Sequence, residues 1–360
     1  MTRTSALKPV SFSDIAGWAQ DNHQLAHAAF CKSAKEILEH GQGFKRASFY
    51  GGERGDWLEV CHKGLTATSS QDFFEAEFQP LAVTIDGESL FTGYYEPQVK
   101  GSVMQTEEFC VPLYAKPPEL VAFNLAEREA TGLNYGNRNK VAKAYFTRQE
   151  IEQGALSGRG LEICYLKSWA EAYFIHIQGN GRILLDNGTA LQLSFAAKNG
   201  HPYKSIGRVL LDQGIGTPQT MSMQFLKEWM SANPPLARQL MWENLSFIFF
   251  GTTDKIEPDL GAIGAAKVPL TPLRSIAVDR SVWAFATPLF VSTHLPPVNG
   301  GGEFRQLMIA QDTGSAIKGV VRGDIYWGWG PEAETCAGHM KQPGQIIALL
   351  PKPLAKRLTQ

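Results

Sequence analysis

Two aspartates in a glycine-rich stretch near the carboxyl end could carry acid–base chemistry. Asp312 and Asp324 stand in QDTGSAIKGVVRGDIYWGWG, residues 311–330, with five glycines around and between them. Glycine at this density lets the backbone turn sharply and approach a ligand closely. Aromatic faces suit sugar rings, and they desolvate a neighbouring carboxyl group and raise its pKa. Three aromatic residues follow the second aspartate: Tyr326, Trp327 and Trp329. A glycine-rich barrel corner with an aspartate as turn former is the alternative interpretation.

Two other segments offer polar and aromatic groups at the ends of predicted elements. FTGYYEP, residues 91–97, is typical of an aromatic strand stopped by proline, and a strand that only fills a core has the same pattern. Gln178 and Asn180 flank a glycine and could reach sugar hydroxyls, although amides at turns are common without function. His176 has no second ligand at metal spacing, so we interpret it as a structural strand histidine. Neither a metal nor a cofactor is expected.

The composition is that of an ordinary globular protein with a full core. Of the 360 residues 44% are apolar and 19% are charged, and the net charge of −1 leaves no nucleic-acid footprint. Length alone allows one large or two medium domains. The motifs G-x-G-x-x-G, P-loop, H-E-x-x-H and G-x-S-x-G do not occur, which argues against the common nucleotide-binding, zinc-protease and α/β-hydrolase classes.

Cysteine usage and hydropathy give expectations about the compartment. The five cysteines are widely spaced without C-x-x-C, so we expect free thiols rather than a disulfide framework or a zinc site. Neither a secretory apolar core at the start nor a run long enough to span a membrane is present in the sequence. The expectation is a soluble chain without a visible export signal or lipid-bearing cysteine.

The first hundred residues predict helices and then strands. Helical spacing of apolar residues predicts a helix over 13–40 with Ser13 as its cap. A second helix should begin at Ser69 and turn Phe73, Phe74 and Phe78 inward. Strands are predicted over 81–85 and 89–95, around a turn at Asp86-Gly87.

The middle region predicts a small β domain with several helices. Glu171–Gln178 is interpreted as a strand that begins a meander, followed by the strands 182–185 and 191–195. Short helices are expected after Thr147, from Ser205, from Thr217 with Met221, Phe225 and Trp229 on one face, and over 235–243. A buried strand over 245–250 closes the region.

The last hundred residues predict short strands and glycine-rich corners, typical of a small barrel. The expected strands are 274–277, 284–290, 304–310 and 345–350, with a Pro-Gly loop over 296–302. The basic tail 352–360 is expected to be frayed.

Three aspartates of the last region, Asp279 in AVDRS, Asp312 and Asp324, resemble the "three-aspartate" domain of cell-wall lytic enzymes. FTGYYEP, YFIHIQGNGRI, SIGRVLLDQG and NLSFIFF stand in the order found in the family of membrane-bound lytic murein transglycosylase A. The resemblance covers about residues 51–350. It implies a mainly β fold with some helices: a double-psi β-barrel domain, residues 1–100 plus 250–360, interrupted by a second, smaller β-barrel domain, residues 101–249. A glycan groove is expected between the two.

The resemblance also implies an activity. Members cleave the β-1,4 bond between N-acetylmuramic acid and N-acetylglucosamine in peptidoglycan and leave a 1,6-anhydromuramoyl end, with one acid/base group. The matching position is Asp324, with Asp312 and Asp279 in support. The expected partner is the peptidoglycan strand, not nucleic acid, and the expected location is the periplasm or cell envelope. The residues expected to contact the glycan are Thr92, Tyr94, Tyr95, Glu96, Gln178, Asn180, Tyr326, Trp327 and Trp329.

Two other classes of function stay open at this point. Asp312-Thr313-Gly314-Ser315 spells the D-T-G-S of aspartic proteases, but a pepsin-like chain needs a second such segment, and no other D-T-G or D-S-G occurs. A non-catalytic glycan-binding module would keep the aromatic and amide residues and would not depend on Asp324.

Overall fold

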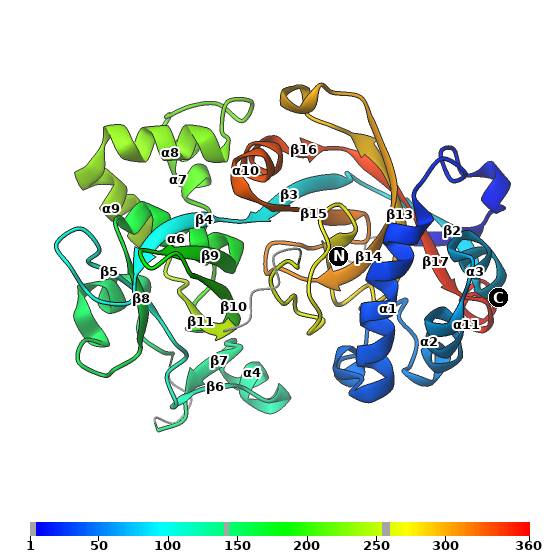
Figure 1. Cartoon of the computed structure of the whole chain (residues 1–360), viewed down its shortest axis with the longest axis horizontal. Helices are drawn as coiled ribbons and strands as arrows, with labels where there is room; N and C mark the ends of the chain where they lie inside the picture. The colour runs from blue at the N-terminus through cyan, green and yellow to red at the C-terminus, as the bar shows by residue number, and fades with distance from the viewer. Residues whose placement is uncertain (1–4, 140–143, 254–259) are drawn as a thin grey trace. The chain divides into compact units, whose positions relative to one another are not determined.

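The computed structural model describes residues 5–139, 144–253 and 260–360. The chain divides into two compact units, Met1–Tyr95 with Ile263–Gln360 and Glu96–Ala262. Strand β3, Leu90–Glu96, carries the chain from the first unit into the second (Figure 1). Each unit has its own sheet and its own hydrophobic core.

Within the described residues, the first unit holds a nine-stranded mixed sheet in the order β1-β2-β17-β13-β14-β12-β15-β3-β16. Its remaining strands are β1 (Ser5–Pro9), β2 (Phe78–Ile85), β12 (Ser275–Val278), β13 (Pro288–His294), β14 (Glu303–Asp312), β15 (Arg322–Trp329), β16 (Lys341–Gln342) and β17 (Gly344–Pro351). This pairing has two ends, β1 and β16, and shows no closed barrel. The double-psi β-barrel therefore stays a prediction.

The central strands are apolar at consecutive positions because both faces of the sheet are buried. Side chains alternate between the faces of a strand. On β14, Leu307 and Ile309 pack into one core cluster while Met308 and Ala310 pack into another. The same alternation divides Leu289 from Phe290 on β13. A strand covered on both sides reads as continuously apolar, which explains the 304–310 pattern.

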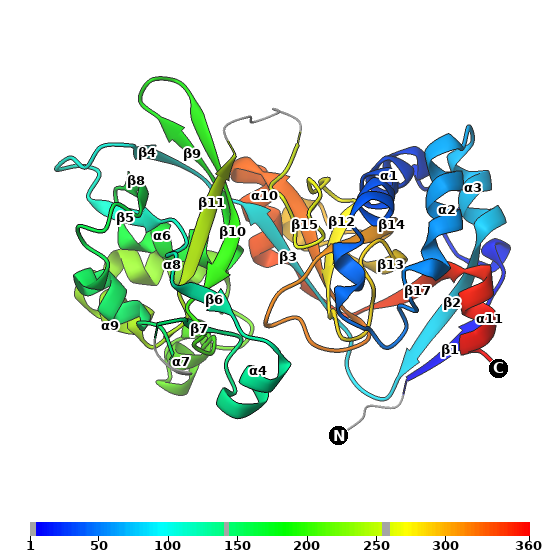
Figure 2. The same ribbon diagram turned by 90° about the horizontal axis from the view of Figure 1, so that it is seen from below.

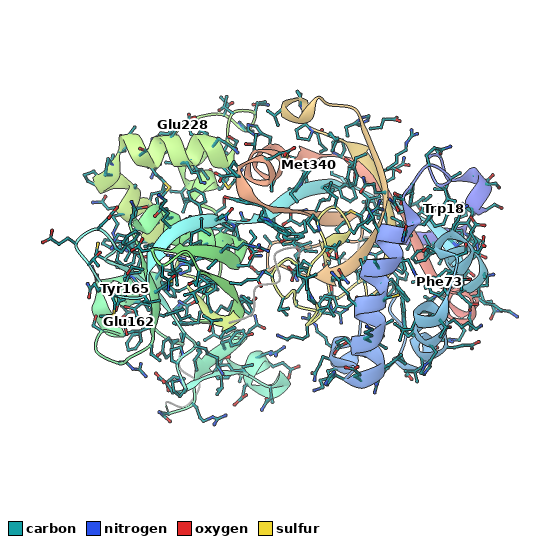
Figure 3. The ribbon with its side chains drawn as sticks, in the orientation of Figure 1. Trp18, Phe73, Glu162, Tyr165, Glu228 and Met340 are labelled. Carbon is teal, nitrogen blue, oxygen red and sulfur yellow. The ribbon has the colours of Figure 1, made fainter. Side chains whose placement is uncertain are left out.

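Helices cover the first of these two core clusters. α1 (His23–Glu39), α2 (Gly55–Thr66) and α3 (Ser70–Glu77) gather beside the β14–β17 part of the sheet (Figure 2). Trp18 and Phe73, labelled in Figure 3, belong to this cluster. Short 3₁₀ segments, α10 and α11 complete the unit: η1 (Phe12–Asp14), η2 (Gln42–Lys45), η4 (Pro297–Asn299), α10 (Gly330–His339) and α11 (Lys352–Leu358).

The second unit has a six-stranded sheet in the order β11-β10-β9-β4-β8-β5 and a two-stranded sheet of β6 and β7. The strands are β4 (Gln98–Ser102), β5 (Val111–Tyr114), β6 (Leu120–Ala122), β7 (Tyr135–Asn137), β8 (Glu162–Leu166), β9 (Asn180–Leu185), β10 (Ala190–Lys198) and β11 (Ile248–Thr253). The helical elements are α4 (Leu125–Thr131), α5 (Arg148–Glu150), η3 (Ile151–Ala155), α6 (Trp169–Gln178), α7 (Ile206–Asp212), α8 (Met223–Ala232) and α9 (Pro234–Trp242).

The prediction of a strand over 171–178 is wrong, because this segment is helix α6. The Ser168 side chain accepts a hydrogen bond from the Glu171 amide and begins the helix, and Gly179 ends it in the left-handed conformation. His176 is therefore a helix residue. It is buried, and Arg148 donates to its Nδ1 at 3.0 Å. Burial lowers the pKa of His176 well below its usual value.

Several other predicted elements need smaller corrections. The first helix begins at His23 with Asn22 as its cap, not at Ser13. β2 and β3 are strands but not a hairpin, since β2 pairs with β1 and β17 while β3 lies between β15 and β16. The last strand boundaries shift by a few residues, and the 284–290 strand begins at Pro288. The tail is not frayed, because α11 buries Leu354 and Ala355 against the core.

Candidate active site

The three aspartates gather around one end of strand β12. Ala277 pairs with Asp312 of β14 on one side and with Asp324 of β15 on the other. Since neighbouring strands lie about 4.8 Å apart, the backbones of the two aspartates are about 10 Å apart. Asp279 follows β12 directly. Residues far apart in the sequence thus share one small region of the first unit.

A bulge in β14 turns the Asp312 side chain to the face of the sheet on which Tyr94 lies. The pairing shifts between Ile276 and Ala277, which leaves Gln311 as an extra residue. Its side chain turns toward α1, donating to the Ala29 carbonyl and the Ser33 hydroxyl at 2.8 Å each. Asp312 accordingly points away from α1 and toward Tyr94. Bulges of this kind re-aim side chains next to active sites.

Asp324 accepts one short hydrogen bond and remains partly exposed. Thr92 on β3 donates its hydroxyl to Asp324 Oδ1 at 2.5 Å. Arg322, two residues earlier on the same face of β15, donates Nη2 to Thr92 Oγ1 at 2.9 Å. Burial raises the pKa of Asp324 above its usual value, although the Thr92 hydrogen bond and the Arg322 cation act to lower it. A carboxyl group with these properties can hold a proton and still reach a ligand.

Three protein groups donate hydrogen bonds to the Asp312 carboxylate. Its Oδ1 accepts from the amides of Ala265 and Thr313 at 2.9 Å each, and its Oδ2 accepts from the Tyr94 hydroxyl at 3.0 Å. Burial raises the pKa of Asp312, and the neighbouring charge of Asp324 raises it further. Three donors fix this carboxylate and leave it poorly placed to act on a ligand.

Asp279 holds a loop. It is buried and accepts hydrogen bonds from the amide and hydroxyl of Ser281 and from the Gly319 amide. Burial acts to raise the pKa of Asp279, but these hydrogen bonds outweigh it and keep the pKa below the usual value. The residue therefore joins the end of β12 to the loop that precedes β15.

The aromatic residues near Asp324 divide between two faces of β15. Tyr326 is on the Asp324 face, fully buried, with its ring centroid 5.2 Å from that of Tyr94. Trp327 lies on the other face, packed against the second core cluster, and lines a cavity of about 480 Å³ with residues of α10 and the β13–η4 segment. Trp329 is the partly exposed N-cap residue of α10. Tyr326 thus forms the floor beside Asp324 and has no surface for a sugar.

The end of β3 supplies two buried residues with protein partners. Tyr95 is 1% exposed and lies beside Glu334, which adds to the effect of burial in raising the pKa of the phenol. Glu96 is fully buried, accepts from Gln192 Nε2 at 3.1 Å and lies 3.3 Å from Arg182 Nε. Both side chains therefore support the backbone around Tyr94 and β9 in this structure.

Gln178 and Asn180 occupy the junction between α6 and β9 in the second unit. Gln178 is the last residue of α6, and Asn180 is the first residue of β9. Within the described residues, Asn180 Oδ1 is buried and has no hydrogen-bond partner. Arg322 was not among the predicted site residues, although its position two residues before Asp324 on a strand places both side chains on one face.

Comparisons with protein-family models and with solved structures together decide the family. Residues 90–251 match the "MltA specific insert domain" and residues 274–350 match the "3D domain". A crystal structure of membrane-bound lytic murein transglycosylase from Agrobacterium tumefaciens has a TM-score of 0.89 at 32% identity, covering 98% of this chain and 99% of that chain. The chain belongs to the membrane-bound lytic murein transglycosylase A family.

Two other members of the membrane-bound lytic murein transglycosylase A family extend the comparison. The Vibrio cholerae protein is 34% identical over 270 residues, which are 73% of this chain and 66% of that protein, so the chain spans just under two thirds of its length. A structure of Escherichia coli MltA with bound chitohexaose has a TM-score of 0.68 at 26% identity and covers 98% of this chain and 93% of that one. Among the described residues, neither a helix able to cross a membrane nor a cluster of three metal-binding side chains is found.

Proposed function

We propose that this chain is a lytic transglycosylase that cleaves the β-1,4 bond between N-acetylmuramic acid and N-acetylglucosamine in peptidoglycan. The observation that carries the proposal is the state of Asp324. It is partly exposed, its pKa is raised by burial, and among the residues that the structure describes it accepts one short hydrogen bond, from Thr92 to its Oδ1. Family membership and the chitohexaose bound to the E. coli protein support a glycan as the substrate.

The reaction requires one group that acts first as an acid and then as a base. Asp324 gives its proton to the glycosidic oxygen while the bond from C1 of the muramic acid to that oxygen breaks. It then takes the proton of the C6 hydroxyl of the same sugar, as the C6 oxygen bonds to C1. An aspartic acid with an ordinary pKa of about 3.9 is almost fully ionised at neutral pH, so the raised pKa is what makes the first step accessible.

Asp312 supports the site and does not act as a second catalytic carboxyl group. Glycoside hydrolases use two carboxyl groups, of which the second activates water or attacks C1. Both oxygens of Asp312 already accept hydrogen bonds from Tyr94, Ala265 and Thr313. The arrangement therefore favours internal attack by the C6 hydroxyl over attack by water. Asp279, held by Ser281 and Gly319, serves to order the loop before β15.

The remaining assignments of substrate contacts are also proposals. Thr92 contacts Asp324, and Tyr94 contacts Asp312, so both lie beside the reacting bond if Asp324 is the acid. Trp329 and Gln178, both partly exposed, are further candidates for sugar contacts, as is Asn180, whose amide oxygen has no hydrogen-bond partner in the described part of the chain. The expected glycan groove between the two units stays a prediction, as does location in the cell envelope.

The two alternative functions make different demands on the same residues. An aspartic protease brings two carboxyl groups together to share a proton, whereas here Asp312 accepts from Tyr94 and Asp324 from Thr92. A non-catalytic glycan-binding protein has no need of an aspartate with a raised pKa.

Digestion of peptidoglycan in water enriched in oxygen-18, followed by mass spectrometry of the products, tests the proposed reaction. The proposal predicts anhydromuropeptides without the heavy isotope, because the C6 oxygen comes from the sugar. Reducing muramic ends that carry oxygen-18 would show a hydrolase instead. No cleavage of peptidoglycan, with glycan still bound, would support the binding-module alternative.

A further inference from the structure

Two consecutive hydrogen bonds, from Arg322 to Thr92 and from Thr92 to Asp324, make the two carboxyl oxygens of Asp324 different. Thr92 Oγ1 lies 2.5 Å from Asp324 Oδ1, and Arg322 Nη2 lies 2.9 Å from the same Thr92 oxygen. A guanidinium group can only donate hydrogen bonds. Thr92 therefore accepts from Arg322 and turns its own hydrogen toward Asp324. Oδ1 is an acceptor in this arrangement, whether or not Asp324 is protonated.

We propose that Arg322 is a positioning residue that acts through Thr92 to leave Asp324 Oδ2 as the oxygen that exchanges the catalytic proton. The inference rests on the proposed function of Asp324. In the first step the Oδ2–H bond breaks and the proton goes to the glycosidic oxygen as its bond to C1 breaks. In the second step Oδ2 takes the proton of the C6 hydroxyl as the C6 oxygen bonds to C1. Oδ1 keeps its hydrogen bond from Thr92 throughout.

The position of the Arg322 guanidinium is itself fixed by the two strands it joins. Its Nη1 donates to the Leu90 carbonyl at 3.2 Å and to the Gly323 carbonyl at 2.5 Å, while Nη2 donates to Thr92. Leu90 and Thr92 are two residues apart on β3, and Arg322 and Asp324 are two residues apart on β15. The guanidinium thus joins β3 to β15 beside the Asp324 side chain. A planar fork with several donors suits this task better than an ammonium group.

Burial raises the pKa of Asp324, and two of its neighbours act to lower it. Arg322 on β15 and Thr92 on β3 stabilise its ionised form. Asp312 on β14 and Tyr94 on β3 also feel the charge of Asp324, which raises the pKa of each. Loss of Arg322 or of the Thr92 hydroxyl should therefore raise the pKa of Asp324. Because the acid must be protonated to act, the alkaline limb of the activity profile should move to higher pH.

The test compares the pH dependence of anhydromuropeptide release by four variants and one control variant with that of the unchanged protein. Arg322→Gln and Thr92→Val should each slow release at the optimum by about tenfold or more, the loss expected for a charge-assisted hydrogen bond. Both should move the alkaline limb to higher pH. Thr92→Ser keeps the hydroxyl and should lose clearly less activity than Thr92→Val, with a smaller shift of the alkaline limb, and Arg322→Lys should recover part of the loss of Arg322→Gln. Arg357→Gln removes an exposed ion pair with Asp56 and serves as the matched control.

The double variant Arg322→Gln/Thr92→Val tests whether Arg322 acts on Asp324 through Thr92, which we call the relay, or whether the two residues act on Asp324 separately. Two residues that act through one hydrogen bond should give a double loss close to the larger single loss. Additive losses with an unmoved alkaline limb would overturn the inference. If Arg322→Gln does not fold, the contrast between Thr92→Val and Thr92→Ser decides in its place: equal pH profiles for the two would contradict the relay. Failure of the proposed function would show differently, as full activity of Asp324→Asn.

Discussion

Asp312 and Asp324 both pair with Ala277, one from each side of strand β12. This shared partner explains how two aspartates with different hydrogen bonds can belong to one site. Asp312 is fixed by three protein donors, whereas Asp324 accepts from Thr92 at a single oxygen. The strand between them keeps the carboxylates from pairing directly, and their mutual repulsion still raises the pKa of Asp312.

The first prediction concerns the stability that Asp312 supplies. Asp312→Ala leaves the Ala265 and Thr313 amides and the Tyr94 hydroxyl without their acceptor. Since the Tyr94 side chain is buried and the Thr313 amide is part-buried, leaving them without an acceptor should lower the free energy of unfolding by about 1–3 kcal/mol. Asp312→Asn keeps the Oδ1 acceptor and should lose clearly less. Urea unfolding of both variants measures this, and equal losses would show that the hydrogen bonds of Asp312 do not hold the site.

The second prediction uses the raised pKa of Asp324. Burial lifts its folded-state pKa above 3.8, so its contribution to stability is complete below that pH and is lost as the pH rises through the folded pKa. Asp324→Asn does not ionise. At neutral pH this variant should therefore be more stable than the unchanged protein, and the difference should shrink as the pH falls toward 3.8. Thermal unfolding at a series of pH values tests this; a difference independent of pH would contradict the raised pKa.

The sequence predicted local elements better than it predicted the topology. Local patterns predicted the strand before Asp312 and the helices that begin at Ser69, at Ser205 and after Thr147. Each of these depends on residues within a few positions of one another. The pairing of Asp312 and Asp324 around Ala277 depends on β12, which the sequence places more than thirty residues before Asp312.

The misassigned segment 171–178 shows why burial hides the period of a helix. Residues Ala172 to His176 are all buried, so no exposed face marks a helical repeat. A short run of apolar and aromatic residues then reads equally well as a strand. Ser168, Glu171 and Gly179 carried the correct signal, an N-cap three residues before a glutamate and a glycine at the end.

The aromatic residues after Asp324 could not be sorted from the sequence alone. Alternation along β15 puts Tyr326 and Trp327 on opposite faces, but only the packing shows that both faces are covered. Tyr326 lies under the site, and Trp327 lies against α10. The helix α10 itself went unpredicted, although Pro331 in its first turn was a usable signal.

The third prediction concerns Gly93, which lets Trp327 approach strand β3. A Cβ at this position would lie 2.5 Å from Trp327 Nε1 and 2.7 Å from the Ala337 backbone. Gly93→Ala should therefore lower the free energy of unfolding by about 1–3 kcal/mol, as overpacking does. At Gly55, the first residue of α2, a Cβ meets nothing within 4 Å. Gly55→Ala should be neutral or stabilising by up to about 1 kcal/mol. Chemical unfolding of the two variants compares them, and equal effects would contradict the close contact.

The fourth prediction separates binding from chemistry. A proton that matters chiefly in the transition state contributes little to ground-state binding. Asp324→Asn should bind chitohexaose nearly as tightly as the unchanged protein, while Gln178→Ala should bind more weakly by about 0.5–1.5 kcal/mol, the net value of one hydrogen bond. Calorimetry measures both affinities. An equal loss in the two variants would show that either the sugar contact or the acid is misplaced.

The role of Asp324 as acid and base is tested most directly by the rate at which Asp324→Asn releases anhydromuropeptides from peptidoglycan. Asparagine keeps the shape of the side chain and the acceptor for Thr92 but cannot carry the proton. We predict a folded protein, with an unchanged circular dichroism spectrum, whose release is slower by at least about 10²-fold. Release at a nearly normal rate by the folded variant would contradict the assignment of Asp324 as the acid and base.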